Sequence, residues 1–256
     1  MIEILKQNLI TYHFNDKKRY GICGGYSGGE PDSQMGDSDG GYVICQLDGD
    51  YDGYISCGVS DEESFTRDFL NDHATLNKDN SWAFDATIDD YPWEFTNEIQ
   101  FIKENIDKTN DLSDIIDKHN NMFIKMDIEG GEFEWLNTIS TETLNKVKQL
   151  VIEFHGFILG DRNFPILSFE DKINSLKKIG ETHYIMHVHG NNHELDGVVD
   201  GIPHILELTF VNKRYFSQEP PLNTIPFPIH GLDYPNSAQK YFDFVLNKYP
   251  FCHPSS

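Results

Sequence analysis

The sequence FIKMDIEGGEFEWL, residues 123–136, changes from a strand pattern to a helix pattern within a few positions. The apolar residues Phe123, Ile124, Met126 and Ile128 in its first half suit a buried strand of an α/β sheet. Gly130 and Gly131 then allow a sharp turn of the backbone before a helical segment begins. Open α/β sheets bind ligands just beyond the carboxyl ends of their strands. Asp127 and Glu129 stand at such an end and are expected to serve a site, although Glu129 could instead cap the glycine turn.

The segments on either side alternate between strand and helix patterns, which predicts an α/β, doubly wound fold with a mostly parallel sheet. We expect strands at residues 54–59, 81–85, 98–102, 123–128 and 149–155, and helices at residues 63–70, 112–119, 141–148 and 169–179. Residues 182–189 and 205–211 have the pattern of an antiparallel closing hairpin.

The chain shows no internal repeat and no linker, so we expect a single domain over residues 1–256. Residues 1–53 are expected to form an N-terminal arm and a small β extension rich in Gly and Asp. Residues 54–215 form the predicted core. Residues 216–256 are expected to form a proline-rich tail that ends in a helix over residues 237–248.

The composition disfavours several classes of partner. The 256 residues include 20 Lys and Arg against 42 Asp and Glu, a formal net charge of −22. This charge argues against nucleic acid, whose phosphates attract basic residues, and against anionic membranes. The four cysteines show no C-x-x-C spacing, which argues against a zinc knuckle and for a reducing compartment. We see no signal peptide or apolar span and expect a soluble, cytoplasmic protein.

Gly58 and Asp85 mark the predicted cofactor end of the sheet. Gly58 lies at the end of the first predicted core strand and Asp85 at the end of the second, where doubly wound folds hold their cofactor. An acidic residue at the second position can accept both ribose hydroxyls of an adenosine, although a turn-capping role is the alternative. Residues 61–63 are Asp-Glu-Glu and would repel a pyrophosphate, which disfavours NAD and ATP. S-Adenosyl-L-methionine has a sulfonium and no phosphate, so it tolerates this acidity.

Several motifs resemble those of FkbM-type, S-adenosylmethionine-dependent methyltransferases: ISCGVSDEESF at residues 55–65, AFDAT at 83–87 and KMDIEGGE at 125–132, with flanking motifs at 39–43 and 232–236. The similarity runs from Arg19 to Asn236. It implies a Rossmann-like class I methyltransferase fold, with a seven-stranded sheet whose last strand is antiparallel. It also implies an O-methyltransferase that acts on a sugar or polyketide hydroxyl.

The expected cofactor contacts are Gly58, Val59, Ser60, Phe65, Asp85, Ala86, Asp111, Leu112 and Tyr42. The sequence departs from the usual class I pattern at Cys57, where an acidic residue is common, and it lacks a second glycine in this loop. The contact to the methionine amino group is therefore left to Asp127 or to the loop at residues 39–42.

A metal site is predicted at the ends of the following strands. Asp127 ends one strand, Glu153 and His155 end the next, and His187 and His189 lie on the closing hairpin. We predict that Asp127, Glu153 and His189 bind a divalent cation, Mg²⁺ or Mn²⁺, because oxygen and imidazole ligands suit these ions. A carboxylate in the apolar strand around Glu153 is costly unless it is paired or metal-bound. The histidines also have a structural alternative, as hydrogen-bonded groups at strand ends.

These residues predict a metal-assisted methyl transfer to a sugar or glycan acceptor. A hydroxyl is a weak nucleophile near neutral pH, and a bound cation lowers its pKa and orients it. A base then removes the proton; His155 is the first candidate and Lys125 the second. Two alternatives stay open: a catalytically silent module that binds a glycan or a protein, and a methyltransferase that acts on a small natural product or a protein.

Overall fold

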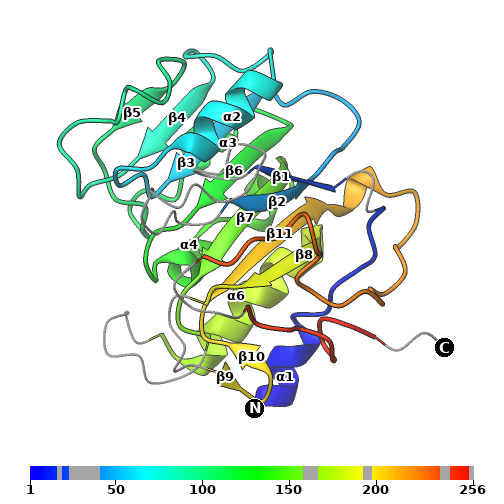
Figure 1. Cartoon of the computed structure of the whole chain (residues 1–256). Helices are drawn as coiled ribbons and strands as arrows, with labels where there is room; N and C mark the ends of the chain where they lie inside the picture. Colours follow the sequence, from blue (N-terminus) through cyan, green and yellow to red (C-terminus); the bar gives the residue numbers. More distant parts are fainter. Residues whose placement is uncertain (16–18, 23–40, 158–166, 193–197, 237–242, 254–256) are drawn as a thin grey trace.

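Seven strands form one sheet in the computed structural model, which describes residues 1–15, 19–22, 41–157, 167–192, 198–236 and 243–253. Their order is β5-β4-β3-β6-β7-β11-β8 (Figure 1). Their bounds are β3 (Gly53–Cys57), β4 (Ser81–Phe84), β5 (Gln100–Ile102), β6 (Met122–Met126), β7 (Val147–Phe154), β8 (His183–Gly190) and β11 (Leu206–Asn212). β11 runs antiparallel to both of its neighbours, whereas the pairs from β5 to β7 are parallel. The predicted mostly parallel sheet with an antiparallel closing pair is confirmed.

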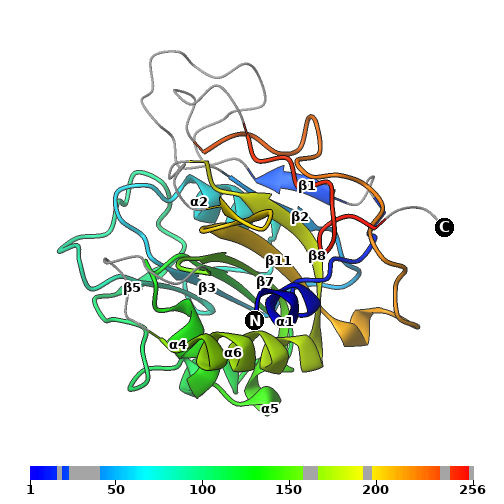
Figure 2. The same cartoon turned by 90° about the horizontal axis from the view of Figure 1, so that it is seen from below.

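Helices and a small hairpin cover the two faces of this sheet (Figure 2). One face carries α4 (Glu132–Thr138), α5 (Thr141–Leu144) and α6 (Phe169–Thr182), with α1 (Ile2–Gln7) packed into the same core. The other face carries α2 (Ser64–Asp72) and the antiparallel pair of β1 (Arg19–Ile22) and β2 (Tyr42–Cys45). The remaining elements are α3 (Ser113–Ile116), β9 (Val198–Val199), β10 (Ile202–Pro203) and the short helix η2 (Lys213–Tyr215). No helix within the described ranges has the length and apolar character needed to cross a bilayer.

Some predicted helix boundaries shift in the structure. α5 is shorter than expected because β7 begins at Val147 and takes residues that the helix pattern included. α3 likewise ends at Ile116. α6 continues past Gly180 to Thr182, because Gly180 keeps a helical backbone and does not end the helix.

The predicted helix at residues 237–248 is wrong for its described part. Residues 243–248 are not helical, and Leu246 pairs with Phe227 through backbone hydrogen bonds of 2.8 and 3.3 Å. Both side chains are buried, so their packing outweighs the local helix preference. Residues 237–242 and most of the Gly/Asp-rich stretch, residues 23–40, lie outside the described residues.

The Gln149 side chain attaches the β1–β2 pair to the sheet. Its amide accepts a hydrogen bond from the Cys45 N–H at 2.7 Å and donates one to the Cys45 carbonyl at 3.0 Å. The buried amide therefore pairs with β2 as a strand backbone would. Tyr42 of the same strand packs edge-to-face on Phe65 of α2, with ring centroids 5.6 Å apart. These contacts fix β2 and α2 over one face of the central strands.

The contribution of His183 to the stability of the protein is expected to fall as the pH drops below about 6.5, because His183 is buried as a neutral imidazole. Its Nε2 lies 3.1 Å from the Val147 carbonyl oxygen and its Nδ1 2.7 Å from Thr182 Oγ1. Burial lowers the pKa of His183 to about 3. The unfolded chain therefore takes up the proton first, and the stability that His183 contributes at neutral pH declines by about 2 kcal/mol at pH 5.

Urea unfolding at pH 7 and pH 5 tests this expectation. The variant His183→Gln should lose less stability between the two pH values than the unaltered protein. An equal loss in both proteins would show that another group causes the acid sensitivity.

Candidate functional site

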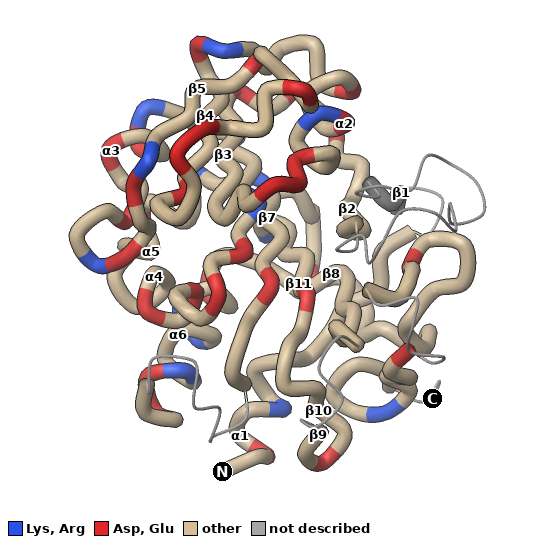
Figure 3. Tube along the Cα trace, turned by 60° about the vertical axis from the view of Figure 1, so that its left-hand side comes forward, with Lys and Arg blue, Asp and Glu red and all other residues tan. Residues whose placement is uncertain are grey.

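The carboxyl ends of the central strands carry a row of charged side chains. Successive strand residues point to opposite faces, so Glu153, like Val151, points to the face that carries α2. Asp127 and His155 follow directly after β6 and β7. Glu207 of β11 is directly opposite Glu153 in the antiparallel ladder, and His189 of β8 is opposite Glu207. Figure 3 shows acidic residues gathered around these strand ends. Groups that are distant in sequence thus form one row across four strands.

Three members of this region lie close enough to share a cation. One ligand atom each from Asp127, Glu153 and His155 lie within 4.8 Å of one another. Glu153 and His155 are each 4% exposed, and Asp127 is half-buried. Two carboxylates and an imidazole at this separation can hold a divalent cation. The structure therefore brings the predicted ligands Asp127 and Glu153 together.

His189, the third predicted ligand, does not join this group. Its Nδ1 lies 3.1 Å from Glu207 Oε2 and its Nε2 lies 2.9 Å from Asp243 Oδ2. Burial by itself lowers the pKa of His189, but the two carboxylates raise it well above its usual range. His187 is engaged in a similar way, since its Nε2 lies 2.6 Å from Asp233 Oδ1. His155 is therefore the candidate imidazole ligand, because Asp233 and Asp243 of the tail contact His187 and His189.

Glu153 is a buried carboxylate with incomplete compensation. Asn191 donates a hydrogen bond to its Oε1 at 3.0 Å, whereas its Oε2 has no hydrogen-bond partner among the described residues. Burial raises the pKa of Glu153 well above its usual range, and the neighbouring charges of Asp127 and Glu207 raise it further. A cation at this position would offset both effects.

His155 lies between carboxylates on both sides. Its Nδ1 is 3.2 Å from Glu132 Oε1, and its Nε2 is 3.3 Å from Glu153 Oε1 and 3.4 Å from Glu129 Oε2. Burial by itself lowers the pKa of His155, but hydrogen bonds to Glu132 and Glu153 raise it to about 12. An imidazolium held in this way cannot accept a proton, so the geometry does not support His155 as the general base, and binding of a cation through Nε2 would require that this nitrogen first release its proton.

Glu132 is a candidate site residue that the sequence patterns did not single out. It opens α4 directly after the glycine turn, and its carboxylate is fully buried. Its Oε1 accepts hydrogen bonds from the Gly130 and Ile128 N–H groups at 3.0 and 3.2 Å. Glu132, and not Glu129, therefore caps the turn. The available signal was an acidic residue three positions after Glu129 at the start of an apolar helix turn.

Lys125, the second candidate base, supports the loop that follows β3. Its Nζ donates a hydrogen bond to the Gly58 carbonyl at 2.9 Å. Glu63 is buried beside it, where burial raises the pKa of the Glu63 carboxyl and the Lys125 charge opposes that shift. Lys125 is thus placed to position the loop and not to abstract a proton.

The loop itself passes very close to the end of β6. Gly58 has a φ of +80°, and a Cβ built there would lie 1.6 Å from the Asp127 carbonyl oxygen. Asp85 holds the next residues, since its Oδ2 accepts from the Val59 and Ser60 N–H groups, each at 2.9 Å. Burial by itself raises the pKa of Asp85, but bonds from this loop and from Thr87 lower it below its usual value.

Asp85 therefore has a turn-capping role in the structure. Its Oδ1 also accepts from the Thr87 N–H and hydroxyl, at 2.7 and 2.6 Å. A ribose would have to compete with these bonds or share the oxygens. The side chain nevertheless lies directly against the Gly58–Ser60 backbone, as the sequence predicts for the cofactor end of the sheet.

The other predicted cofactor contacts take varied positions. Phe65 and Tyr42 are buried and pack on each other. Leu112 is buried in the core next to α4 and has a φ of 69°. The Asp111 carbonyl accepts a hydrogen bond from Trp135 Nε1 at 3.0 Å. Ala86 is half-buried directly after Asp85. The Gly58–Ser60 loop with Asp85 is thus the part of the predicted cofactor site that the structure assembles most clearly.

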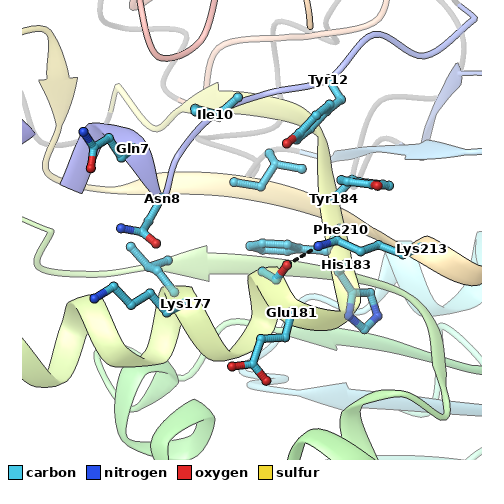
Figure 4. Close-up of a pocket in the computed structure, with 13 residues that line it drawn as sticks. Gln7, Asn8, Ile10, Tyr12, Lys177, Glu181, His183, Tyr184, Phe210 and Lys213 are labelled. Atoms are coloured by element: carbon cyan, nitrogen blue, oxygen red, sulfur yellow. Dashed lines mark hydrogen bonds between the residues drawn. The ribbon is translucent and has the colours of Figure 1, made fainter. Parts of the chain in front are cut away.

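A pocket of about 230 Å³ lies elsewhere, between α1, α6 and the start of β8 (Figure 4). Tyr12 and Tyr184 line it, with ring centroids 4.6 Å apart. Lys213 lies at its side and donates a hydrogen bond to the Gly180 carbonyl. Because β8 begins at His183, this pocket is at the amino ends of the parallel strands, and it plays no part in the group around Glu153.

The strand order, with β11 inserted antiparallel between β7 and β8, and the glycine loop at the carboxyl edge are those of a methyltransferase of class I type. The chain belongs to the FkbM methyltransferase family, whose model, described as the methyltransferase FkbM domain, matches residues 8–192. A comparison with curated proteins gave no match.

Replacing Gly58 by alanine is expected to destabilise the protein by about 2 kcal/mol or more, because the new Cβ collides with the Asp127 backbone. Gly201→Ala is the matched control, since Gly201 has a φ of +83° but nothing within 4 Å of its Cβ position. Chemical unfolding should show a clearly larger loss for the first variant. Equal losses would mean that the contact with Asp127 is unimportant.

Proposed function

We propose that this methyltransferase transfers the methyl group of S-adenosyl-L-methionine to a hydroxyl of a sugar or glycan, with the help of a divalent cation. The observation that carries the proposal is the convergence of Asp127, Glu153 and His155 within 4.8 Å. The Asp127 backbone touches the Gly58 loop, so this group adjoins the expected cofactor end of the sheet. The acceptor class follows from the family resemblance.

The local charge supports a cationic occupant. Six acidic side chains and two imidazoles are linked in the described part of the chain: Asp127, Glu129, Glu132, Glu153, Glu207, Asp243, His155 and His189. Even with both imidazoles and Glu153 protonated, the five remaining carboxylates exceed the two positive charges by three. Buried charge of one sign is costly. A divalent cation and a sulfonium are groups that would offset this excess, and a neutral acceptor would add nothing to it.

The proposed ligands are Asp127, Glu153 and His155. When bound, the cation would lower the pKa of the acceptor hydroxyl and orient it toward the methyl group. We propose Glu129 as the proton acceptor. Its side chain is 76% exposed, its Oε2 is 3.4 Å from His155 Nε2, and its φ of 55° is a strained conformation of the kind often kept at functional sites.

Calorimetry with S-adenosyl-L-methionine tests the cofactor. We expect saturable binding, and no competition from NAD or ATP, because residues 61–63 are acidic. If no binding heat is measured at millimolar S-adenosyl-L-methionine, the enzyme hypothesis is rejected. Binding without methyl transfer to a broad panel of sugars, nucleotide sugars and oligosaccharides would favour a silent binding module, and transfer to proteins or small natural products would change the acceptor class.

Removal of the cation is expected to abolish methyl transfer. Activity lost in EDTA should return with Mn²⁺ in the unaltered protein, but not in Glu153→Gln, which removes a ligand charge while it keeps the side-chain shape. Glu142→Gln, on the exposed side of α5, is the control. Full activity in EDTA after exhaustive dialysis would disprove the cation requirement.

Glu129→Gln is expected to lower kcat by about 10²- to 10⁴-fold, the usual contribution of a general base. Its affinity for S-adenosyl-L-methionine should stay within about twofold, because the side chain projects into solvent. Glu134→Gln, two helix positions after Glu132, serves as the matched control. A variant with unchanged kcat would remove Glu129 from the mechanism and leave the cation site untouched.

A further inference from the structure

We infer that Glu132 is a positioning residue that presents Nε2 of His155 to the cation and thereby makes the site prefer Mn²⁺ over Mg²⁺. The inference rests on the proposed cation site and adds two things to it: the atom of His155 that binds, and the class of cation that is favoured.

The Glu132 carboxylate is held from several directions. Besides the two N–H groups of the glycine turn, its Oε2 accepts from the His155 N–H at 3.4 Å, and its Oε1 lies 3.2 Å from His155 Nδ1. The side chain has 0% exposure. A carboxylate fixed in this way sets the orientation of the imidazole ring through its contact with Nδ1.

This contact decides which nitrogen of His155 faces the proposed cation. A carboxylate can only accept, so Nδ1 carries a proton toward Glu132. Nε2 then faces Glu153 Oε1 at 3.3 Å and Glu129 Oε2 at 3.4 Å, and it would bind a cation after releasing its own proton. Histidines that bind metals commonly give their other N–H to a carboxylate, which fixes the tautomer and raises the basicity of the ligating nitrogen. The Glu132–His155 pair has this arrangement.

A second observation points to an ion and not only to an internal salt bridge. Glu153 is 4% exposed, and its Oε2 finds no hydrogen-bond partner in the described part of the chain. If His155 merely neutralised its neighbours, it would still leave this oxygen uncompensated beside Asp127 and Glu207. The same oxygen is available as a ligand next to Nε2.

The donor set then indicates the kind of cation. Mg²⁺ strongly prefers oxygen ligands and keeps several waters. Mn²⁺ accepts carboxylates and lies higher than Mg²⁺ in its affinity for nitrogen ligands. A site with two carboxylates and one well-oriented imidazole should therefore bind Mn²⁺ more tightly, and the imidazole should account for the difference.

Electron spin-echo envelope modulation of the unaltered protein loaded with Mn²⁺ tests the ligand directly. We expect the ¹⁴N coupling of a bound imidazole, and its loss in His155→Gln. A bound Mn²⁺ without nitrogen coupling would overturn the inference while the cation site itself stands. No binding of Mn²⁺ at all would instead reject the cation part of the proposed function.

Calorimetry with Mn²⁺ and Mg²⁺ tests the positioning role. Glu132→Gln should weaken Mn²⁺ binding by about 10- to 100-fold and Mg²⁺ binding much less, so that the preference for Mn²⁺ shrinks. The affinity for S-adenosyl-L-methionine, measured in parallel, reports whether the variant is folded, and Glu134→Gln is the control for charge on α4. An unchanged Mn²⁺-to-Mg²⁺ ratio in a folded Glu132→Gln would reject the role; if this variant does not fold, His155→Gln with an unchanged ratio would do so.

Discussion

A buried carboxylate needs a positive partner, and this requirement organises the carboxyl edge of the sheet. Two partners are internal: His187 compensates Asp233, and His189 lies between Glu207 and Asp243. Around Glu153 the compensation is incomplete. The fold thus concentrates unbalanced negative charge at one place, next to the loop that a methyltransferase uses for its cofactor.

The segment from Asp127 to Glu132 links the backbone to the chemistry. The Asp127 N–H extends the β3–β6 ladder by donating to the Cys57 carbonyl at 2.9 Å, and its carbonyl fills the space above Gly58. The same short stretch then turns and places the Glu132 carboxylate against the His155 ring, 3.2 Å from Nδ1. Six consecutive residues, 127–132, therefore fix the position of the Gly58 loop, the candidate ligand Asp127 and the orientation of the His155 ring. Mutations in this segment should consequently affect all three.

The sequence predicted the parts of this arrangement that depend on local pattern. Apolar strands and amphipathic helices alternate with a clear period, so the sheet, its closing pair and the placement of Asp127 and Glu153 at strand ends followed from them. The choice between His155 and His189 did not, because it depends on Asp243, a residue with no local signature that reaches His189 only in the folded chain. Glu132 escaped notice for a related reason, since a glutamate at a helix start usually faces solvent.

The position of β11 has a consequence for how the protein is made. The family match ends at residue 192, and it includes β8 but not β11, which is the strand neighbour of β8 in the sheet and separates it from β7. During synthesis, β7 and β8 leave the ribosome before the strand that joins them exists. The seven-stranded sheet is complete only after Asn212 has been added, so the family match and the sheet have different boundaries.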